Sequence, residues 1–358
     1  MSGIGKEYEE AAAEIYQDLR NEMSRLDDWR AEVSGFRERL YEDYKEPIDL
    51  LEALIIYSHE TGEEIDRVFG AEATQGPNFR LIALQKLHGR GILIAREILT
   101  LIKSGFADGA QARWRALHEV ATVAVFISRS SVETAKRYLL HEAIDDYQLA
   151  DKIRDYPATR GLPEVSDEVM EGLSEKRETL RGTFNTYYSG TWGWAADELG
   201  NKSPGFKDIE ESVGFESYRP HHFYASKLNI HGGAKGAMSQ LGMVGSRPYS
   251  TTASPTNYGF SLPGTDTAIS VFFFSTALIS GTGDLAYNRD AKVMEFFVED
   301  IEDSFEKAEK EIRERERECQ EEIIKHELGE NIHSFLKEYD PTRLNAITID
   351  SESLDDPP

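Results

Sequence analysis

The sequence predicts an all-α protein, a multi-helix bundle with long helical arms at both ends and one long irregular loop. Three observations predict this fold class. Apolar residues recur at steps of three and four along most of the chain, which is the period of one helix face. Alternation typical of strands is absent outside the loop at residues 245–265. The charged segments near both ends also keep a helical spacing.

The N-terminal arm is expected over residues 1–76 as two helices. The first carries an amphipathic stripe whose spacing is close to a heptad seam. Gly35 weakens the middle of this helix, Pro47 ends it or opens the next, and the second helix covers residues 48–69. The arm is either a helical hairpin packed on the body or a dimerisation arm. The stripe consists of Tyr8, Ala12, Ile15, Leu19, Met23, Leu26, Val33, Phe36, Leu40 and Tyr44.

Residues 77–285 are expected to form the helical core domain. Its first three helices are separated by a glycine-containing turn and by a capping box, in which Ser130 and Glu133 satisfy backbone groups at a helix start. These helices are expected over residues 79–103, 109–128 and 130–156.

The rest of the core is less regular. A short helix at residues 167–181 precedes a segment rich in aromatic residues and glycine, which favours packing at a turn over a stacking surface. A helix follows Pro220, and residues 245–265 form a loop of the length that is often functional. The apolar run at residues 268–280 is shorter than the roughly 20 residues that cross a bilayer, so we expect a buried helix.

Two further regions complete the chain. A long C-terminal helix is expected over residues 286–340. Its apolar face is followed by a charged segment, which is either solvated or the flank of a coiled coil. Residues 341–358 are rich in Asp, Ser and Pro and are expected to form a disordered acidic tail.

Composition narrows the functional class. The chain has 65 acidic and 40 basic residues, and its net charge of −25 disfavours broad attraction to nucleic acid, although a small basic pocket remains compatible with it. The single cysteine, Cys319, cannot form an intrachain disulfide, so we expect a cytoplasmic location. Residues 1–20 are acidic and polar, unlike a signal peptide, and no membrane partner is expected.

Motifs of the common enzyme classes are absent. The chain contains no Walker motif, no Gly-x-Gly-x-x-Gly, no cysteine-based zinc pattern and no Gly-x-Ser-x-Gly elbow. The classes that these motifs mark lose support, and we expect no cofactor.

The first candidate site lies in the helix at residues 109–128. Arg115, His118 and Glu119 share one helix face, whereas Arg113 lies about 140° around the helix from His118. An Arg with a His suits metal-independent RNA cleavage, because the imidazole moves protons and the guanidinium holds the phosphate. The structural alternative is an Arg115–Glu119 pair that stabilises the helix, with His118 half-buried.

The second candidate site lies between residues 221 and 231. Tyr224, Lys227 and His231 are expected on one helix face, with His222 nearby, ahead of a glycine pair. A cation, a hydroxyl and an imidazole in this arrangement suit phosphate or nucleotide handling. The structural alternative is a helix C-terminus at which His231 caps backbone carbonyls.

A weaker candidate is a metal pair. His141 and Asp145 are one helical turn apart, and imidazole and carboxylate ligands hold metal ions in helical bundles. The Glu-x-x-His motifs of di-iron bundles are absent, and pairing of these residues with charges on neighbouring turns is the favoured interpretation.

Three segments resemble a known family: PIDLLEALIIYSHETGEEI, HGRGILIAREILTLIKSGFADGAQARWRALHEVATVAVFI and YASKLNIHGG. Over roughly residues 47–280 the chain is similar to the bacterial family called domain of unknown function 5677. This resemblance implies a helical, cytoplasmic bacterial protein, and it implies no settled activity.

A looser resemblance is to the HEPN superfamily, helical proteins of toxin–antitoxin and phage-defence systems. Its active members are metal-independent ribonucleases with an Arg-x(4–6)-His motif at a dimer interface. Arg113 and His118 match that spacing, and His231 resembles the late-helix His, although Lys227 stands where an Arg is expected. The resemblance implies a homodimer acting on RNA in bacterial defence or stress response. His118 or His231 is then the acid/base, and Arg113 or Arg115 clamps the phosphate.

Two other hypotheses stay open. The protein is alternatively a non-enzymatic scaffold that oligomerises or binds a protein partner through its helical arms, with the buried charges as structural networks. A third and weaker hypothesis is a metal-dependent hydrolase that uses His141 and Asp145.

Overall fold

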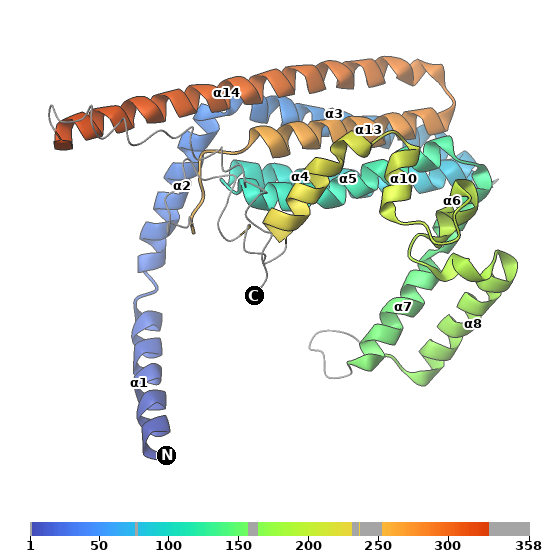
Figure 1. Ribbon diagram of the computed structural model, residues 1–358, viewed down its shortest axis with the longest axis horizontal. Helices are drawn as coiled ribbons and strands as arrows, with labels where there is room; N and C mark the ends of the chain where they lie inside the picture. Colours follow the sequence, from blue (N-terminus) through green and yellow to red (C-terminus); the bar gives the residue numbers. More distant parts are fainter. Residues whose placement is uncertain (1, 76–77, 157–163, 231–235, 237–252, 329–358) are drawn as a thin grey trace, which may run out of the picture.

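The computed structural model describes residues 2–75, 78–156, 164–230, 236 and 253–328, and these residues form helices and loops without a strand. The all-α fold class and the multi-helix bundle are therefore confirmed (Figure 1). Five long helices make up the bundle: α3 (Lys45–Gln75), α4 (Phe79–Lys103), α5 (Ala107–Arg129), α13 (Ser261–Thr282) and α14 (Asn288–Leu328).

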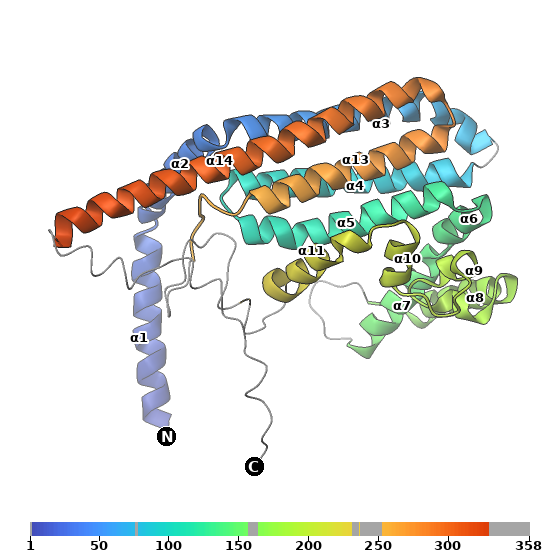
Figure 2. The ribbon, with the colours of Figure 1, turned by 45° about the horizontal axis from the view of Figure 1, so that its top comes forward.

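Helix α13 lies at the centre of this bundle, where it packs against α3, α4, α5 and α14 (Figure 2). Its sequence is apolar on all sides, which is typical of a helix that neighbours surround. Val271 and Phe274 are fully buried, so the predicted buried helix is confirmed. Among the described residues, α13 is the one helix long and apolar enough to span a membrane, and 67% of that stretch is buried inside the bundle.

Two glycines allow the helices next to α13 to approach closely. A Cβ atom on Gly91 of α4 would lie 2.7 Å from the Phe274 ring, and one on Gly264 of α13 would lie 2.3 Å from the Phe305 ring of α14. The aromatic rings occupy the space that larger side chains would need, so these positions tolerate only glycine without rearrangement.

The start of α13 is earlier than the sequence predicts. The helix begins at Ser261, inside the expected loop, because Glu309 of α14 accepts a hydrogen bond from the Ser261 backbone N–H at 3.1 Å. Residues 253–260 are irregular, as expected for the loop, and the rest of the loop before residue 253 lies outside the described residues. The predicted tail and the end of the predicted C-terminal helix, residues 329–358, also lie outside them.

Helices α1 (Ser2–Asn21) and α2 (Arg25–Asp43) leave the bundle one after the other (Figures 1 and 2). Helix α3 instead packs against α4, α13 and α14, and it buries Ile48, Leu51 and Leu54. Packing therefore groups α3 with the bundle, whereas the sequence grouped residues 1–76 as one arm. The difference arises because the apolar face of α3 is covered by the bundle helices and not by α2.

The arm is anchored to the bundle at its C-terminal end. Leu40 and Tyr44 are buried, and the Tyr44 hydroxyl donates a hydrogen bond to the backbone oxygen of Asn257 at 3.0 Å. Phe36 lies close to Gly105, where a Cβ atom would be 2.7 Å from the ring. From residue 8 to residue 35 no side chain is buried. Within the described residues, buried contacts thus anchor the α1–α2 arm at its C-terminal end.

The predicted helix over residues 130–156 is divided in two, α6 (Val132–Leu140) and α7 (Glu142–Asp155). Ser131, and not Ser130, is the N-cap of α6, because its side chain accepts a hydrogen bond from the Thr134 backbone N–H. The Ser130 hydroxyl instead donates to the Phe126 carbonyl at the end of α5. Helix α7 then packs against α8 (Asp167–Thr183) beside the bundle.

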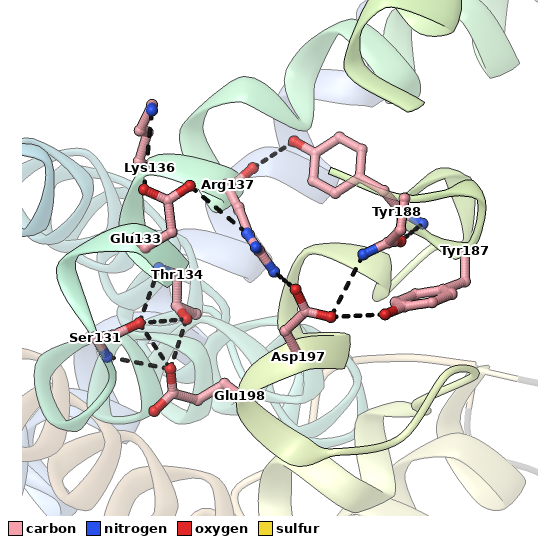
Figure 3. A network of polar contacts seen from close by, with 10 residues as sticks. Ser131, Glu133, Thr134, Lys136, Arg137, Tyr187, Tyr188, Asp197 and Glu198 are labelled. Carbon is pink, nitrogen blue, oxygen red and sulfur yellow. Dashed lines mark hydrogen bonds and ion pairs between the residues drawn. The ribbon is translucent and has the colours of Figure 1, made fainter. Parts of the chain in front are cut away.

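The aromatic segment that follows α8 forms short helical turns, and its predicted packing role is confirmed for Tyr188 and Trp194, which are buried. A polar network ties these turns to α6 (Figure 3). Arg137 of α6 pairs with Asp197, and Tyr187 donates to the same carboxylate at 2.8 Å. The short helices between α8 and residue 219 are η1 (Thr186–Ser189), η2 (Gly193–Ala195), α9 (Ala196–Leu199), α10 (Phe206–Ser212) and η3 (Glu216–Tyr218).

Candidate functional site

A cluster of polar side chains lies where α5 meets α10, α11 (Arg219–Tyr224) and the start of α13. Helix α5 begins at Ala107 and runs without a break, so residues three and four positions apart share a face. The predicted neighbours Arg115, His118 and Glu119 lie on this face. Their partners come from distant parts of the chain.

His118 is at the buried centre of the cluster, with 3% of its side chain exposed. Its Nε2 lies 2.9 Å from Oε1 of Glu210, which is only 1% exposed, and the other Glu210 oxygen pairs with Arg219. Aromatic rings enclose the imidazole. This environment supports the structural alternative for His118, because the described residues leave only 3% of its side chain exposed. The rings belong to Trp114, Phe206, Phe215, Tyr218 and His222.

Arg113 does not join His118. Its side chain forms an ion pair with Glu97 of α4, whereas His118 bonds to Glu210 of α10. The physical reason is the offset of about 140° between the two positions on a straight helix. The spacing that matches the HEPN motif therefore does not bring these two side chains together.

Arg115, Glu119 and His222 do meet, and they join the first predicted site to the second. The Arg115 Nε–H donates to His222 Nε2 at 3.1 Å. Oε1 of Glu119 lies 3.4 Å from an Arg115 nitrogen and 3.6 Å from His222 Nε2. The Arg115 and Glu119 side chains are each 35% exposed and His222 is 18% exposed, so this group faces solvent in part.

Tyr224 and Lys227 follow His222 along the chain and form no bond to this group in the described part of the chain. Tyr224 is half-buried, and burial raises the pKa of its hydroxyl, with a smaller contribution from Asp108. The Lys227 ammonium lies 5.7 Å from the centre of the Phe223 ring. Lys227 belongs to a π-helix, η4 (Ala225–Ile230), which changes the α-helical spacing assumed from the sequence. His231 lies outside the described residues.

His221 and Asp266 form a pair that the sequence did not indicate. His221 Nδ1 lies 2.9 Å from an Asp266 oxygen, and the other oxygen accepts from Gln111 at 3.0 Å. The bond to Asp266 raises the pKa of His221, against a smaller lowering by burial. The pair borders a cleft of about 420 Å³ between α11, α13 and α14. Because Glu302, Glu306 and Glu309 also line it, the cleft is acidic.

His141 marks the junction of α6 and α7. It is buried, and its Nε2 lies 3.1 and 3.0 Å from the carbonyl oxygens of Tyr188 and Gly190. Its Nδ1 lies 3.4 Å from an oxygen of Asp145, which is well exposed. Within the described ranges no three His, Cys, Asp or Glu side chains gather as a metal site. The contacts of His141 are those of a residue that holds two chain segments together.

The α1–α2 arm presents a second candidate site, of an interaction type. Ile15, Leu19 and Trp29 have 61%, 59% and 61% of their surface exposed. Large apolar side chains gathered on one exposed surface mark sites of protein association. The arm therefore offers a binding surface away from the polar cluster.

Comparison with known proteins bears on the central part of the chain. No curated protein and no solved structure matches the chain. Residues 81–245 match the model of DUF5677, described as a family of unknown function. The match begins within α4 and extends beyond α11. It excludes Asp266 and contains the other polar residues described above: Gln111, Arg115, His118, Glu119, Glu210, Arg219, His221 and His222. The central part of this chain, residues 81–245, thus belongs to DUF5677, a family of unknown function.

Proposed function

We propose that this protein acts by association with another protein, and that the α1–α2 arm is its binding surface. The observation that carries the proposal is the apolar stripe between residues 8 and 33, where none of the described side chains is buried. Helices of about 20 residues gain most of their stability from packing of an amphipathic face. A covering partner would supply that packing.

The spacing of the stripe indicates that the partner is another helix. With Trp29 added and Glu22 in place of Met23, the steps alternate strictly between four and three residues, which is the 3.5-residue period of a coiled coil. The turn at residues 22–24 interrupts the helix within this pattern. We call these positions the arm seam. The arm seam consists of Tyr8, Ala12, Ile15, Leu19, Glu22, Leu26, Trp29 and Val33.

The test is the double variant Ile15→Glu/Leu19→Glu. Each buried Ile or Leu contributes about 1.5–3 kcal/mol, so losing two of them is expected to weaken association at least about a hundredfold. Tagged full-length chain would be expressed with an untagged copy in its native cells, and the proteins that co-purify would be quantified for wild type and variant.

The matched control is Ala13→Glu/Gln17→Glu, which adds the same charge to the outer face of α1. It is expected to keep the complex. Equal loss of the complex in both variants, or no loss in either, would contradict an association through the arm seam. Circular dichroism of each variant would verify that the bundle stays folded, because neither pair of residues is buried in it.

A second function, metal-independent cleavage of RNA, is proposed from a separate observation, the part-exposed group of Arg115, Glu119 and His222. In this proposal the His222 imidazole moves the proton and the Arg115 guanidinium holds the phosphate. These roles replace the pair Arg113 and His118. The HEPN likeness and a role in bacterial defence or stress response belong to this second proposal.

The RNA proposal is tested with purified full-length protein and total bacterial RNA in excess EDTA. We expect products with 2′,3′-cyclic phosphate ends, and a loss of rate of about 10²–10⁴-fold in His222→Ala, which is the usual contribution of a general acid or base. His59→Ala is the matched control, because His59 lies on α3 and pairs with Glu63. Intact RNA with the wild-type protein, or equal cleavage by His222→Ala, would remove this function.

A further inference from the structure

We infer that the partner of the arm is a second copy of this chain, and that the two arms pair antiparallel. This inference rests on the proposed association through the arm seam, and it adds the identity and direction of the partner. The seam positions alternate between the two core positions of a heptad, a and d. In an antiparallel pair, each a position of one chain faces a d position of its partner. The seam pairs are Tyr8 with Val33, Ala12 with Trp29, Ile15 with Leu26, and Leu19 with Glu22.

The side-chain volumes fit this register. It places the smallest seam residue, Ala12, opposite the largest, Trp29, so that each layer fills a similar space. A parallel pair would instead place Trp29 against Trp29 and Ala12 against Ala12. One layer would then be crowded and another would contain a gap, and both cost stability.

The charges beside the seam favour the same direction. In the antiparallel register, Glu9 faces the partner's Arg30 and Asp18 faces the partner's Arg25. Tyr16 faces the partner's Met23, which extends the apolar contact. A parallel pair would bring Arg25 beside the partner's Arg30, and opposite and like charges at these flanking positions set partner direction.

Glu22 argues most strongly against a parallel pair. It lies in the turn between α1 and α2, where a parallel arrangement would bring the two Glu22 carboxylates beside each other, and like charges repel. In the antiparallel register Glu22 faces Leu19 near the two-fold axis. There it keeps its ion pair with Arg25 of the same chain, which measures 2.9 Å.

The length of the exposed seam also fits the antiparallel register. Phe36, Leu40 and Tyr44 contact the bundle of their own chain, so the seam is free only up to Val33. The register that pairs Tyr8 with the partner's Val33 covers this free part from end to end. The turn at residues 22–24 between α1 and α2 then lies beside the two-fold axis, where both chains have the same turn.

Cysteine cross-linking of the full chain tests the direction. Two chains would be prepared in a Cys319→Ser background, one with Ile15→Cys and the other with Leu26→Cys, and oxidised alone and as an equal mixture. We expect a covalent dimer in the mixture only. In the antiparallel register Cys at position 15 lies opposite position 26, whereas two copies of position 15 are about 16 Å apart at about 1.5 Å per residue.

The control mixture carries Glu14→Cys and Asp28→Cys, which lie on the outer face of the arm and should stay unlinked. Covalent dimers of the Ile15→Cys chain alone would show a parallel pair and overturn the inference. Absence of cross-linking in every sample would overturn self-pairing altogether. Neither result affects the proposed association itself. That proposal is tested separately, by whether the Ile15→Glu/Leu19→Glu variant loses co-purifying proteins.

Discussion

Replacing Glu210 by Ala is expected to lower the free energy of unfolding by about 1–3 kcal/mol, because it leaves the buried His118 side chain without its hydrogen-bond partner. Glu210 is 1% exposed and lies between His118 and Arg219. Without its carboxylate, His118 loses its hydrogen-bond partner inside the aromatic surroundings, and Arg219, whose side chain is 38% exposed, loses its ion-pair partner. The change also disconnects α10 from α5 and α11.

Urea unfolding followed by circular dichroism would measure this effect. Glu211→Ala is the matched control, because Glu211 is the exposed neighbour and pairs with Lys207 at the surface, so we expect a change within about 0.5 kcal/mol. Glu210→Gln keeps the shape and part of the hydrogen bonding and is expected to fall between the two. Equal stability of Glu210→Ala and Glu211→Ala would show that the buried network does not hold these helices together.

Trp114→Ala is the second large effect, with an expected loss of about 3–5 kcal/mol of unfolding free energy. Trp114 is 1% exposed and lies between α5 and α13. Its indole N–H donates to the Asp266 carbonyl at 2.9 Å and to the Ser270 hydroxyl at 3.0 Å. Truncation leaves a cavity and removes the donor that joins the two helices.

Two further variants separate these contributions. Trp114→Phe keeps most of the apolar volume and removes the N–H donor, so its expected loss is smaller than that of Trp114→Ala. Phe296→Ala removes a comparable ring from an exposed position of α14, and little change is expected. A Trp114→Ala protein as stable as Phe296→Ala would contradict the role of Trp114 in joining α5 to α13.

The helices of the bundle follow from the sequence because helix periodicity is a local property. The helix predicted over residues 79–103 has those limits in the structure, and the next one, predicted over 109–128, spans Ala107–Arg129. The break of α6 from α7 at His141 was missed. No Gly or Pro marks it, and it depends on contacts of His141 with Tyr188 and Gly190, which are 47 and 49 residues away.

Only the residues of the candidate site that lie on α5 could be predicted to be neighbours. Arg115, His118 and Glu119 share a face because of their spacing on α5, and this needed no tertiary information. Their partners are set by folding. Glu210 is 92 residues from His118 and His222 is 107 residues from Arg115, and local spacing contains nothing about such distances. The pairing of Arg113 with Glu97 likewise depends on how α4 lies against α5.

An apolar stripe at helical spacing can be read from the residues alone in both the arm region and α3. Which of the two stripes is covered depends on how the helices pack. Ile48, Leu51 and Leu54 of α3 are buried by the bundle, whereas Ile15 and Leu19 of α1 stay exposed. This is because an apolar stripe indicates that a helix face packs against an apolar partner, but it does not identify that partner. The partner depends on the packing of helices distant in sequence or of a second molecule.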